Sequence, residues 1–199
     1  MDRTFLELRE ALGKPGCFLC RLEESYVRRF LEALFYEFVT DRGVREKIRK
    51  GGFCKDHARR LFALRPSILG IAIVYQDLLH QYLSGTVPDA KLCPVCLGLQ
   101  EYLTRIVHLL GKHWEDLHQS WGKETFVCLP HLASLPEPLR GRLEDTTKVT
   151  LQGILDTLSS FIEKFDYQKS GLPPKPEEAR SWQEAMEFFV GDLVERKKS

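Results

Sequence analysis

Residues 93–121 read CPVCLGLQEYLTRIVHLLGKHWEDLHQSW, and this stretch holds the two features that decide the fold. It opens on two cysteines separated by two residues, Cys93 and Cys96. Apolar residues then recur every three or four positions, at Leu99, Leu103, Ile106, Leu110, Trp114, Leu117 and Trp121. This spacing is that of one face of an α-helix that packs into a core. The stretch predicts a long helix that follows a cysteine pair.

Similar helical stripes run along most of the chain. They predict an N-terminal helix over residues 1–13, further helices from about residues 22, 67 and 143, and a C-terminal helix over residues 177–197 behind a proline-rich linker. Ser67 is the expected N-cap of the helix that starts beside it. No segment alternates with period two for long enough to indicate a strand. The sequence therefore predicts an all-α protein.

Every cysteine belongs to one of four short pairs. Their order is CxxC, CxxH, CxxC, CxxH, and their members are Cys17 and Cys20, Cys54 and His57, Cys93 and Cys96, and Cys128 and His131. The CxxC pairs are 76 residues apart and the CxxH pairs 74 residues apart. Tyr26 and Tyr102 are also 76 residues apart. These offsets predict an internal duplication, with one repeat at residues 14–86 and the other at residues 90–166, within one compact unit.

Three cysteines and one histidine form a standard tetrahedral zinc site, so the four pairs predict two Cys3His sites and two zinc ions per chain. A CxxC at the start of a helix also places its thiolates at the positive end of the helix dipole. Two alternatives remain open: iron–sulfur clusters, and disulfides or free thiols. The other histidines show no ligand spacing; they are His80, His108, His113 and His118.

The pairing of the motifs is a geometric question. A helix unbroken from Cys96 to Trp121 would carry the chain about 37 Å away, and residues 122–127 could return only about 20 Å. Either the helix breaks, with Gly111 as the best place, or Cys93 and Cys96 share a metal with Cys54 and His57. Duplication of a self-sufficient unit favours pairing within each repeat, and we adopt that expectation.

The motifs resemble those of an uncharacterised bacterial family of unknown function, in which a CPxC pair and a GFCxxH segment are both repeated. The resemblance is carried by three segments: Gly52-Phe53-Cys54-Lys55-Asp56-His57, Cys93-Pro94-Val95-Cys96 and Phe126-Val127-Cys128-Leu129-Pro130-His131. Residues 161–167 and the helix with Trp182 resemble the family's C-terminal end. Phe18 departs from the pattern, because Pro94 stands at the matching position. The resemblance implies metal sites and no particular activity.

Composition excludes few classes of partner. The net charge is +1, and the N-terminal residues contain no apolar stretch typical of a signal peptide, so we expect a cytoplasmic protein that is not bound to a membrane. One basic segment, residues 42–60, suggests nucleic acid as a partner. Its cations are Arg42, Arg45, Lys47, Arg49, Lys50, Lys55, Arg59 and Arg60. Phe62 beside it would instead anchor a protein partner.

Closed four-ligand sites leave no position for water or substrate, so we expect a non-enzymatic scaffold or interaction module with an unknown protein partner. A thiol-based redox or zinc-responsive switch is a second hypothesis, because CxxC pairs release metal when they are oxidised. A metal-dependent enzyme is a third. The sequence does not decide the oligomeric state.

Overall fold

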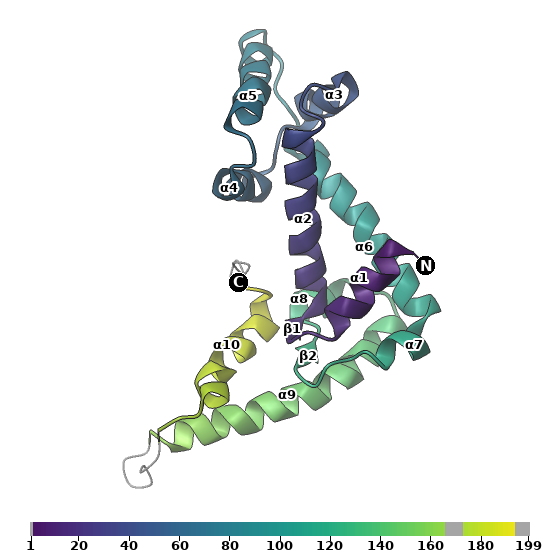
Figure 1. Cartoon of the computed structure of the whole chain (residues 1–199), viewed down its shortest axis with the longest axis vertical. Helices are drawn as coiled ribbons and strands as arrows, with labels where there is room; N and C mark the ends of the chain where they lie inside the picture. Colours follow the sequence, from purple (N-terminus) through teal and green to yellow (C-terminus); the bar gives the residue numbers. More distant parts are fainter. Residues whose placement is uncertain (1, 166–172, 194–199) are drawn as a thin grey trace. The chain divides into compact units, whose positions relative to one another are not determined.

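The structure, a computed structural model, describes residues 2–165 and 173–193. These residues form ten α-helices, one 3₁₀ helix and two short strands, which confirms the all-α class (Figure 1). In chain order the elements are α1 (Arg3–Leu12), β1 (Gly16–Cys17), α2 (Phe18–Tyr36), α3 (Arg42–Gly51), α4 (Lys55–Leu64), α5 (Ile68–Leu83), η1 (Ala90–Leu92), α6 (Pro94–Lys112), α7 (Trp114–His118), β2 (Thr125–Phe126), α8 (Leu129–Ser134), α9 (Leu139–Glu163) and α10 (Pro176–Val190).

Several predicted boundaries are confirmed, and others shift. Ser67 caps α5, because its Oγ accepts a hydrogen bond from the Gly70 amide at 3.1 Å. The long stripe breaks at Lys112, next to Gly111, and resumes in α7. The C-terminal helix ends at Val190 instead of residue 197; residues 194–197 lie outside the described part, as do Asp166 and Tyr167.

The chain divides into two compact units. The first unit comprises Met1–Leu22 and Ile106–Ser199, and the second comprises Glu23–Arg105. These units do not coincide with the predicted repeats. The reason is that each repeat supplies its CxxC pair to one unit and its CxxH pair to the other.

The second unit packs α2, α3, α4 and α5 against the start of α6. Its buried side chains include Leu31, Phe35, Ile48, Leu61 and Val74. Gly51 ends α3 in direct contact with η1, and a Cβ there would lie 2.0 Å from the Leu92 carbonyl oxygen. This close approach requires glycine, and it brings the residue before Cys93 against the segment that leads to Cys54.

The first unit is held by a parallel pairing of its two short strands. Gly16 lies opposite Thr125 and Cys17 opposite Phe126. The buried hydroxyl of Thr125 donates to the carbonyls of Leu12 and Lys14, at 2.9 and 2.8 Å. The pairing therefore fixes the end of α1 and the start of α2 beside the segment that leads to Cys128.

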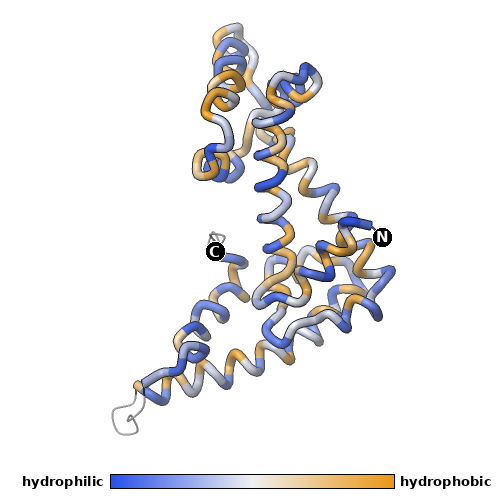
Figure 2. The backbone as a smooth tube through the Cα atoms, in the orientation of Figure 1, coloured by the Kyte–Doolittle hydropathy of each residue, from blue (hydrophilic) through white to orange (hydrophobic). Residues whose placement is uncertain are grey.

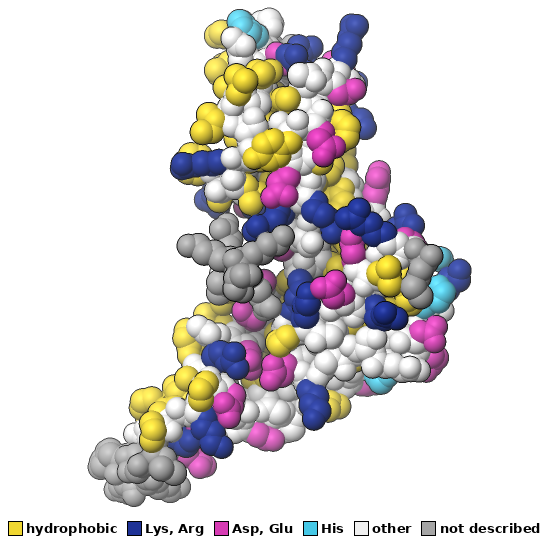
Figure 3. Space-filling view, viewed as in Figure 1, with side chains coloured by type: hydrophobic (Ala, Val, Ile, Leu, Met, Phe, Trp, Pro, Cys, Tyr) yellow, Lys and Arg dark blue, Asp and Glu magenta, His cyan; other side chains and the backbone are white. Residues whose placement is uncertain are grey.

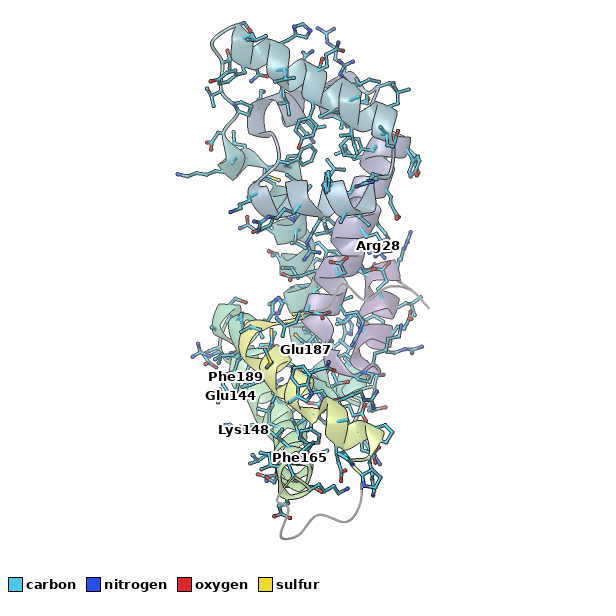
Figure 4. All side chains as sticks on the ribbon, turned by 90° about the vertical axis from the view of Figure 1, so that its left-hand side faces the viewer. Arg28, Glu144, Lys148, Phe165, Glu187 and Phe189 are labelled. Atoms are coloured by element: carbon cyan, nitrogen blue, oxygen red, sulfur yellow. The ribbon has the colours of Figure 1, made fainter. Side chains whose placement is uncertain are left out.

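Helices α9 and α10 lie side by side in the first unit (Figure 1). Lys164 of α9 binds both carboxylate oxygens of the buried Glu178 of α10, at 2.6 and 2.8 Å. On α9, Glu144 and Lys148 form an ion pair one turn apart (Figure 4). We expect a buried apolar stripe on α10, but Trp182, Met186 and Phe189 stay about half exposed.

Candidate metal centres

The eight predicted ligands gather into two groups of four. The Cys17 group consists of Cys17, Cys20, Cys128 and His131, and the Cys54 group of Cys54, His57, Cys93 and Cys96. The ligand atoms of each group lie within 4.8 Å of one another. Each group lies inside one unit, the Cys17 group in the first and the Cys54 group in the second. Both groups have the donor set of three sulfurs and one imidazole that the motifs predict.

Pairing within each repeat, which we expect from the duplication, is wrong. Each group combines the CxxC pair of one repeat with the CxxH pair of the other. The β1–β2 pairing is the physical reason on one side, because it places Cys17 next to the strand before Cys128. Gly51 and η1 are the reason on the other, because they bring Cys93 to Cys54. The long helix also ends at Lys112. The helix break and the shared site of Cys93 and Cys96 with Cys54 and His57, which the sequence offered as alternatives, therefore occur together.

In the Cys17 group, the imidazole of His131 faces all three sulfurs. Its Nδ1 lies 3.6 Å from Cys17 Sγ, 3.5 Å from Cys20 Sγ and 3.1 Å from Cys128 Sγ. The sulfurs of Cys20 and Cys128 are 3.7 Å apart. The amide of Cys128 donates to Cys17 Sγ at 3.4 Å, which stabilises negative charge on that sulfur.

The Cys54 group repeats this geometry. Nδ1 of His57 lies 3.1 Å from Cys54 Sγ, 3.7 Å from Cys93 Sγ and 3.3 Å from Cys96 Sγ. The sulfurs of Cys54 and Cys96 are 3.6 Å apart. The same imidazole nitrogen faces the sulfurs in both groups, because both histidines stand three residues after a cysteine that is a helix N-cap.

These distances fit a single tetrahedral ion. Bonds of about 2.3 Å to sulfur and about 2.05 Å to nitrogen, at tetrahedral angles, separate two sulfurs by about 3.8 Å and a sulfur from a nitrogen by about 3.6 Å. The sulfur pairs in the two groups are 3.7 and 3.6 Å apart. The sulfur–nitrogen distances run from 3.3 to 3.7 Å between motifs, and those inside each CxxH pair are shorter, at 3.1 Å. The residues present therefore fit one zinc-sized ion in each group.

Helix N-termini converge on the sulfurs. Cys54 is the N-cap of α4 and Cys128 that of α8, and neither side chain makes the usual capping hydrogen bond. Cys17 and Cys93 directly precede α2 and α6. The positive end of a helix dipole favours a thiolate over a thiol. The sulfurs are thus placed to bind a cation instead of the helix backbone.

Crowding of the thiols acts against ionisation as long as no cation is bound. Burial, together with the neighbouring thiols of Cys54 and Cys93, raises the pKa of Cys96 to about 12. A coordinated divalent cation reverses this effect, because it deprotonates the thiols that bind it. A bound cation would therefore favour the thiolate form of Cys96.

Sequence reasoning missed one residue at the Cys17 group. Gly191 ends α10 with a φ of 89°, and a Cβ on it would lie 3.5 Å from Cys20 Sγ and 3.9 Å from Cys128 Sγ. The end of α10 thus covers two of the sulfurs. A glycine after an amphipathic helix is a common C-terminal signal, but nothing local indicates that it packs on a distant site.

The other four histidines belong to neither group, and two of them pack against aromatic rings. His113 contacts Phe5 with ring centroids 5.3 Å apart, and His118 contacts Trp114 at 5.2 Å. Among the described residues, only the Cys17 and Cys54 groups bring three or more potential metal ligands together.

Much of the basic segment 42–60 is paired with acidic side chains. Arg45 and Arg49 both form ion pairs with Asp77, at 2.5 and 3.6 Å. The hydrogen bond from Arg45 is the largest cause that holds the pKa of Asp77 below its usual range, and the charges of both arginines add to it. Lys50, Arg59 and Arg60 pair with Glu46, Asp56 and Glu24.

No helix in the described residues is long and apolar enough to cross a bilayer.

Comparison with known proteins gives relatives without an assigned role. A family of unknown function (DUF6062) matches residues 5–90, a range that ends before Cys93. An uncharacterised 23.9 kDa protein in xynA 3'region from Caldicellulosiruptor sp. (strain Rt8B.4) is 28% identical over 200 residues, which cover 92% of this chain and 98% of that protein. No solved structure matches. The chain is therefore similar to proteins of unknown function, which confirms the resemblance to an uncharacterised family.

Proposed function

We propose that this protein is a non-enzymatic scaffold in which two zinc ions, one in each Cys3His group, hold helices in place for a protein partner. The observation that carries the proposal is the pair of four-ligand sets with tetrahedral spacing. Four protein ligands close a zinc site, so no position is left for water or a substrate. Each ion would crosslink segments that are far apart in the sequence, as structural metal ions do.

Zinc suits these groups better than the alternatives. Ligand atoms within 4.8 Å of one another enclose one ion and leave no room for an iron–sulfur cluster between them. All six cysteines are free, and the sulfurs of Cys20 and Cys128 and of Cys54 and Cys96, 3.7 and 3.6 Å apart, are well beyond the disulfide bond length of about 2.05 Å. Reduced thiols of this kind persist in the cytoplasm, and we place the protein there.

A duplication from a single CxxC/CxxH unit remains part of the proposal. Each predicted repeat gives its CxxH pair to the CxxC pair of the other repeat. Two copies of one ancestral unit would produce this reciprocal arrangement. Nucleic acid is the less favoured partner, because five of the eight cations in segment 42–60 already pair with acidic groups.

Metal analysis is the first test. Protein purified without chelator should contain two zinc ions per chain, with X-ray absorption indicating three sulfurs at about 2.3 Å and one nitrogen at about 2.0–2.1 Å per ion. His131→Ala should lose one equivalent and melt at a lower temperature, because an opened cage loses much of its binding free energy. The control His80→Ala changes an exposed histidine outside both groups and should keep both ions. A metal-free protein that melts unchanged would end the structural role.

A redox switch is the second candidate, and partial exposure of Cys20, Cys54 and Cys96 favours it. An oxidant that reaches these sulfurs would convert thiolate pairs to disulfides and release zinc. Titration with hydrogen peroxide, followed by zinc release and mass spectrometry, separates the two functions. A structural site should hold its zinc at peroxide concentrations that oxidise an ordinary free thiol, whereas a switch should release it and rebind it after thiol reduction.

A further inference from the structure

Helix α5 of the second unit presents an extended apolar surface to solvent. It carries an exposed stripe, here called the α5 stripe, whose members are Ile68, Leu69, Ala72, Tyr75, Gln76, Leu79, Tyr82 and Leu83. Its six large apolar side chains are 37% to 81% exposed. Hydrophobic side chains gather over α4 and α5 in Figure 3, and the apolar residues recur along α5 in Figure 2. Exposed apolar surface of this extent marks a binding site.

The α5 stripe contains no charge. The ionisable groups of α5 other than tyrosine are Asp77 and His80, and Asp77 points to Arg45 and Arg49 of α3. A charged ligand therefore finds no complementary group on the stripe. An equally uncharged apolar surface fits it, and the stripe itself is such a surface.

The stripe is also complementary to itself. Its members are symmetric about the point between Tyr75 and Gln76, so an antiparallel copy places Ile68 opposite Leu83 of the partner subunit. The same operation places Leu69 opposite Tyr82 of the partner subunit and the small Ala72 opposite the large Leu79 of the partner subunit. This reciprocal pattern is what an isologous two-fold interface requires.

A cavity at the start of α5 can receive the C-terminal end of the same helix from a second copy. A cavity of about 340 Å³ lies between α4 and α5, lined by Ala58, Leu61, Phe62, Arg65, Ile68, Ile71 and Tyr75. Leu83, the most exposed member of the stripe, stands at the other end of the helix. Antiparallel pairing brings that end of each copy to the cavity of the other.

The area is sufficient for a stable dimer. Six side chains that each cover on the order of 100–150 Å² give roughly 800 Å² per copy, about what a standard-size interface buries on each side. We propose that two copies of this chain associate through antiparallel packing of their α5 stripes. This inference rests on the proposed interaction role and names its partner as a second copy.

The oligomeric state of the full, zinc-loaded chain tests the proposal. Sedimentation equilibrium at tens of micromolar should give twice the chain mass of 23.0 kDa. Leu79→Glu should raise the dissociation constant at least about 30-fold, as for a hot-spot residue, because it buries a charge in the interface. Leu155→Glu, at an exposed leucine of α9, is the matched control and should stay dimeric. Circular dichroism and zinc content check that both variants fold.

A charge exchange tests the register. Ala72→Glu and Leu79→Lys should each weaken the dimer, and the double variant should regain it, because the two substituted positions face each other across the two-fold axis. A monomeric wild-type chain, a dimer indifferent to Leu79→Glu, or a double variant that stays monomeric would overturn the proposal. A monomer with two zinc ions would reject the dimer alone, and a dimer without zinc would reject the zinc scaffold alone.

Discussion

The rings of Tyr26 and Tyr102 stack on each other, with centroids 4.8 Å apart and an interplanar angle of 23°. These two residues hold the same position in the two predicted repeats. At an isologous two-fold interface, a residue near the axis meets its own counterpart. The contact joins α2 to α6 within the second unit, and it supports an origin of the chain by duplication.

Gly98 makes room for this contact, so we expect Gly98→Ala to destabilise the protein. A Cβ at this position would lie 2.3 Å from the hydroxyl oxygen of Tyr26. The strain should lower the free energy of unfolding by about 1–2 kcal/mol, despite the better helix propensity of alanine. Gly153→Ala in α9, where nothing lies within 4 Å, should instead stabilise the protein by about 0.5–1 kcal/mol.

A second substitution assigns the cause of that loss. Tyr26→Phe removes the clashing oxygen, so Gly98→Ala should cost less in this background, where the nearest remaining contact is Phe30 Cε2 at 3.3 Å. Urea unfolding of the four proteins in this cycle measures the coupling. Equal losses in both backgrounds would mean that the tyrosine hydroxyl is not the obstacle.

The exchange of motifs makes a prediction about metal stoichiometry. Cys20 and His131 belong to one group, so Cys20→Ser/His131→Ala should lose one zinc ion and keep the other. Cys20→Ser/His57→Ala damages both groups and should lose both ions. Pairing within each repeat would give the opposite result for the two double variants. Zinc-to-protein ratios after gel filtration decide between them.

Gly191 should affect zinc release from one group only. Its φ of 89° strains any other residue, so Gly191→Ala should loosen the end of α10 over Cys20 and Cys128 and speed chelator uptake of one zinc ion several-fold. Gly85→Ala carries the same backbone strain, with a φ of 88°, but a Cβ there meets nothing within 4 Å. If both variants release zinc at the same rate, the cover has no role in retention.

The link between α9 and α10 should depend on pH. The hydrogen bond from Lys164, followed by those from the Lys175 amide and Ser160, lowers the pKa of Glu178 from 4.5 to about 2. A lowered pKa means that the ionised group stabilises the fold fully above its unfolded-state pKa of about 4.5, and that this stability is lost as the pH falls towards 2. Glu178→Gln should therefore lower the melting temperature at pH 7, and the difference from wild type should narrow below pH 4.5.

Glu144→Gln is the control for this effect, because Glu144 forms a solvent-exposed pair with Lys148 one turn away on α9. Such pairs contribute about 0–1 kcal/mol, so this variant should melt close to wild type. Melting curves of the three proteins from pH 7 to pH 3 make the comparison. A constant difference between wild type and Glu178→Gln across this range would contradict the assignment.

Local chemistry in the sequence was enough to predict the all-α class, most of the long helices and the ligands, but not the shorter helices α3, α4 and α8. The stripe from Leu99 to Trp121 predicts α6 and α7, and the two-residue spacing identifies all eight side chains that the structure gathers. The grouping was not predictable, because it depends on contacts with no local pattern. Strands of two residues, such as Gly16–Cys17, are too short to show alternation, and the approach of Gly51 to Leu92 joins distant segments.

The exposed helices mark another limit. The stripe of α10 has the period of a core face, yet Trp182, Met186 and Phe189 remain about half exposed, since period alone does not say which surface covers a helix. The periodic face of α5 does pack into the core through Val74, and a second apolar face of the same helix remains exposed. The segment from 42 to 60 is basic in sequence, but its charge is balanced by Asp77 and Glu24 from other helices. The ion pairs follow from the fold and could not be read from the segment.

The interleaving of the two groups along the chain sets an order in which they can be completed at the ribosome. His57 and Cys93 are 36 residues apart, whereas Cys20 and Cys128 are 108 apart, so closing the second span costs about 1 kcal/mol more in chain entropy. The last ligand of the Cys54 group, Cys96, is synthesised 35 residues before the last ligand of the Cys17 group, His131. At normal rates of synthesis this interval is roughly 2–7 s. Cys17 and Cys20 are made before the other six ligands, yet their group is completed last, and for that interval the nascent chain carries an uncoordinated thiol pair.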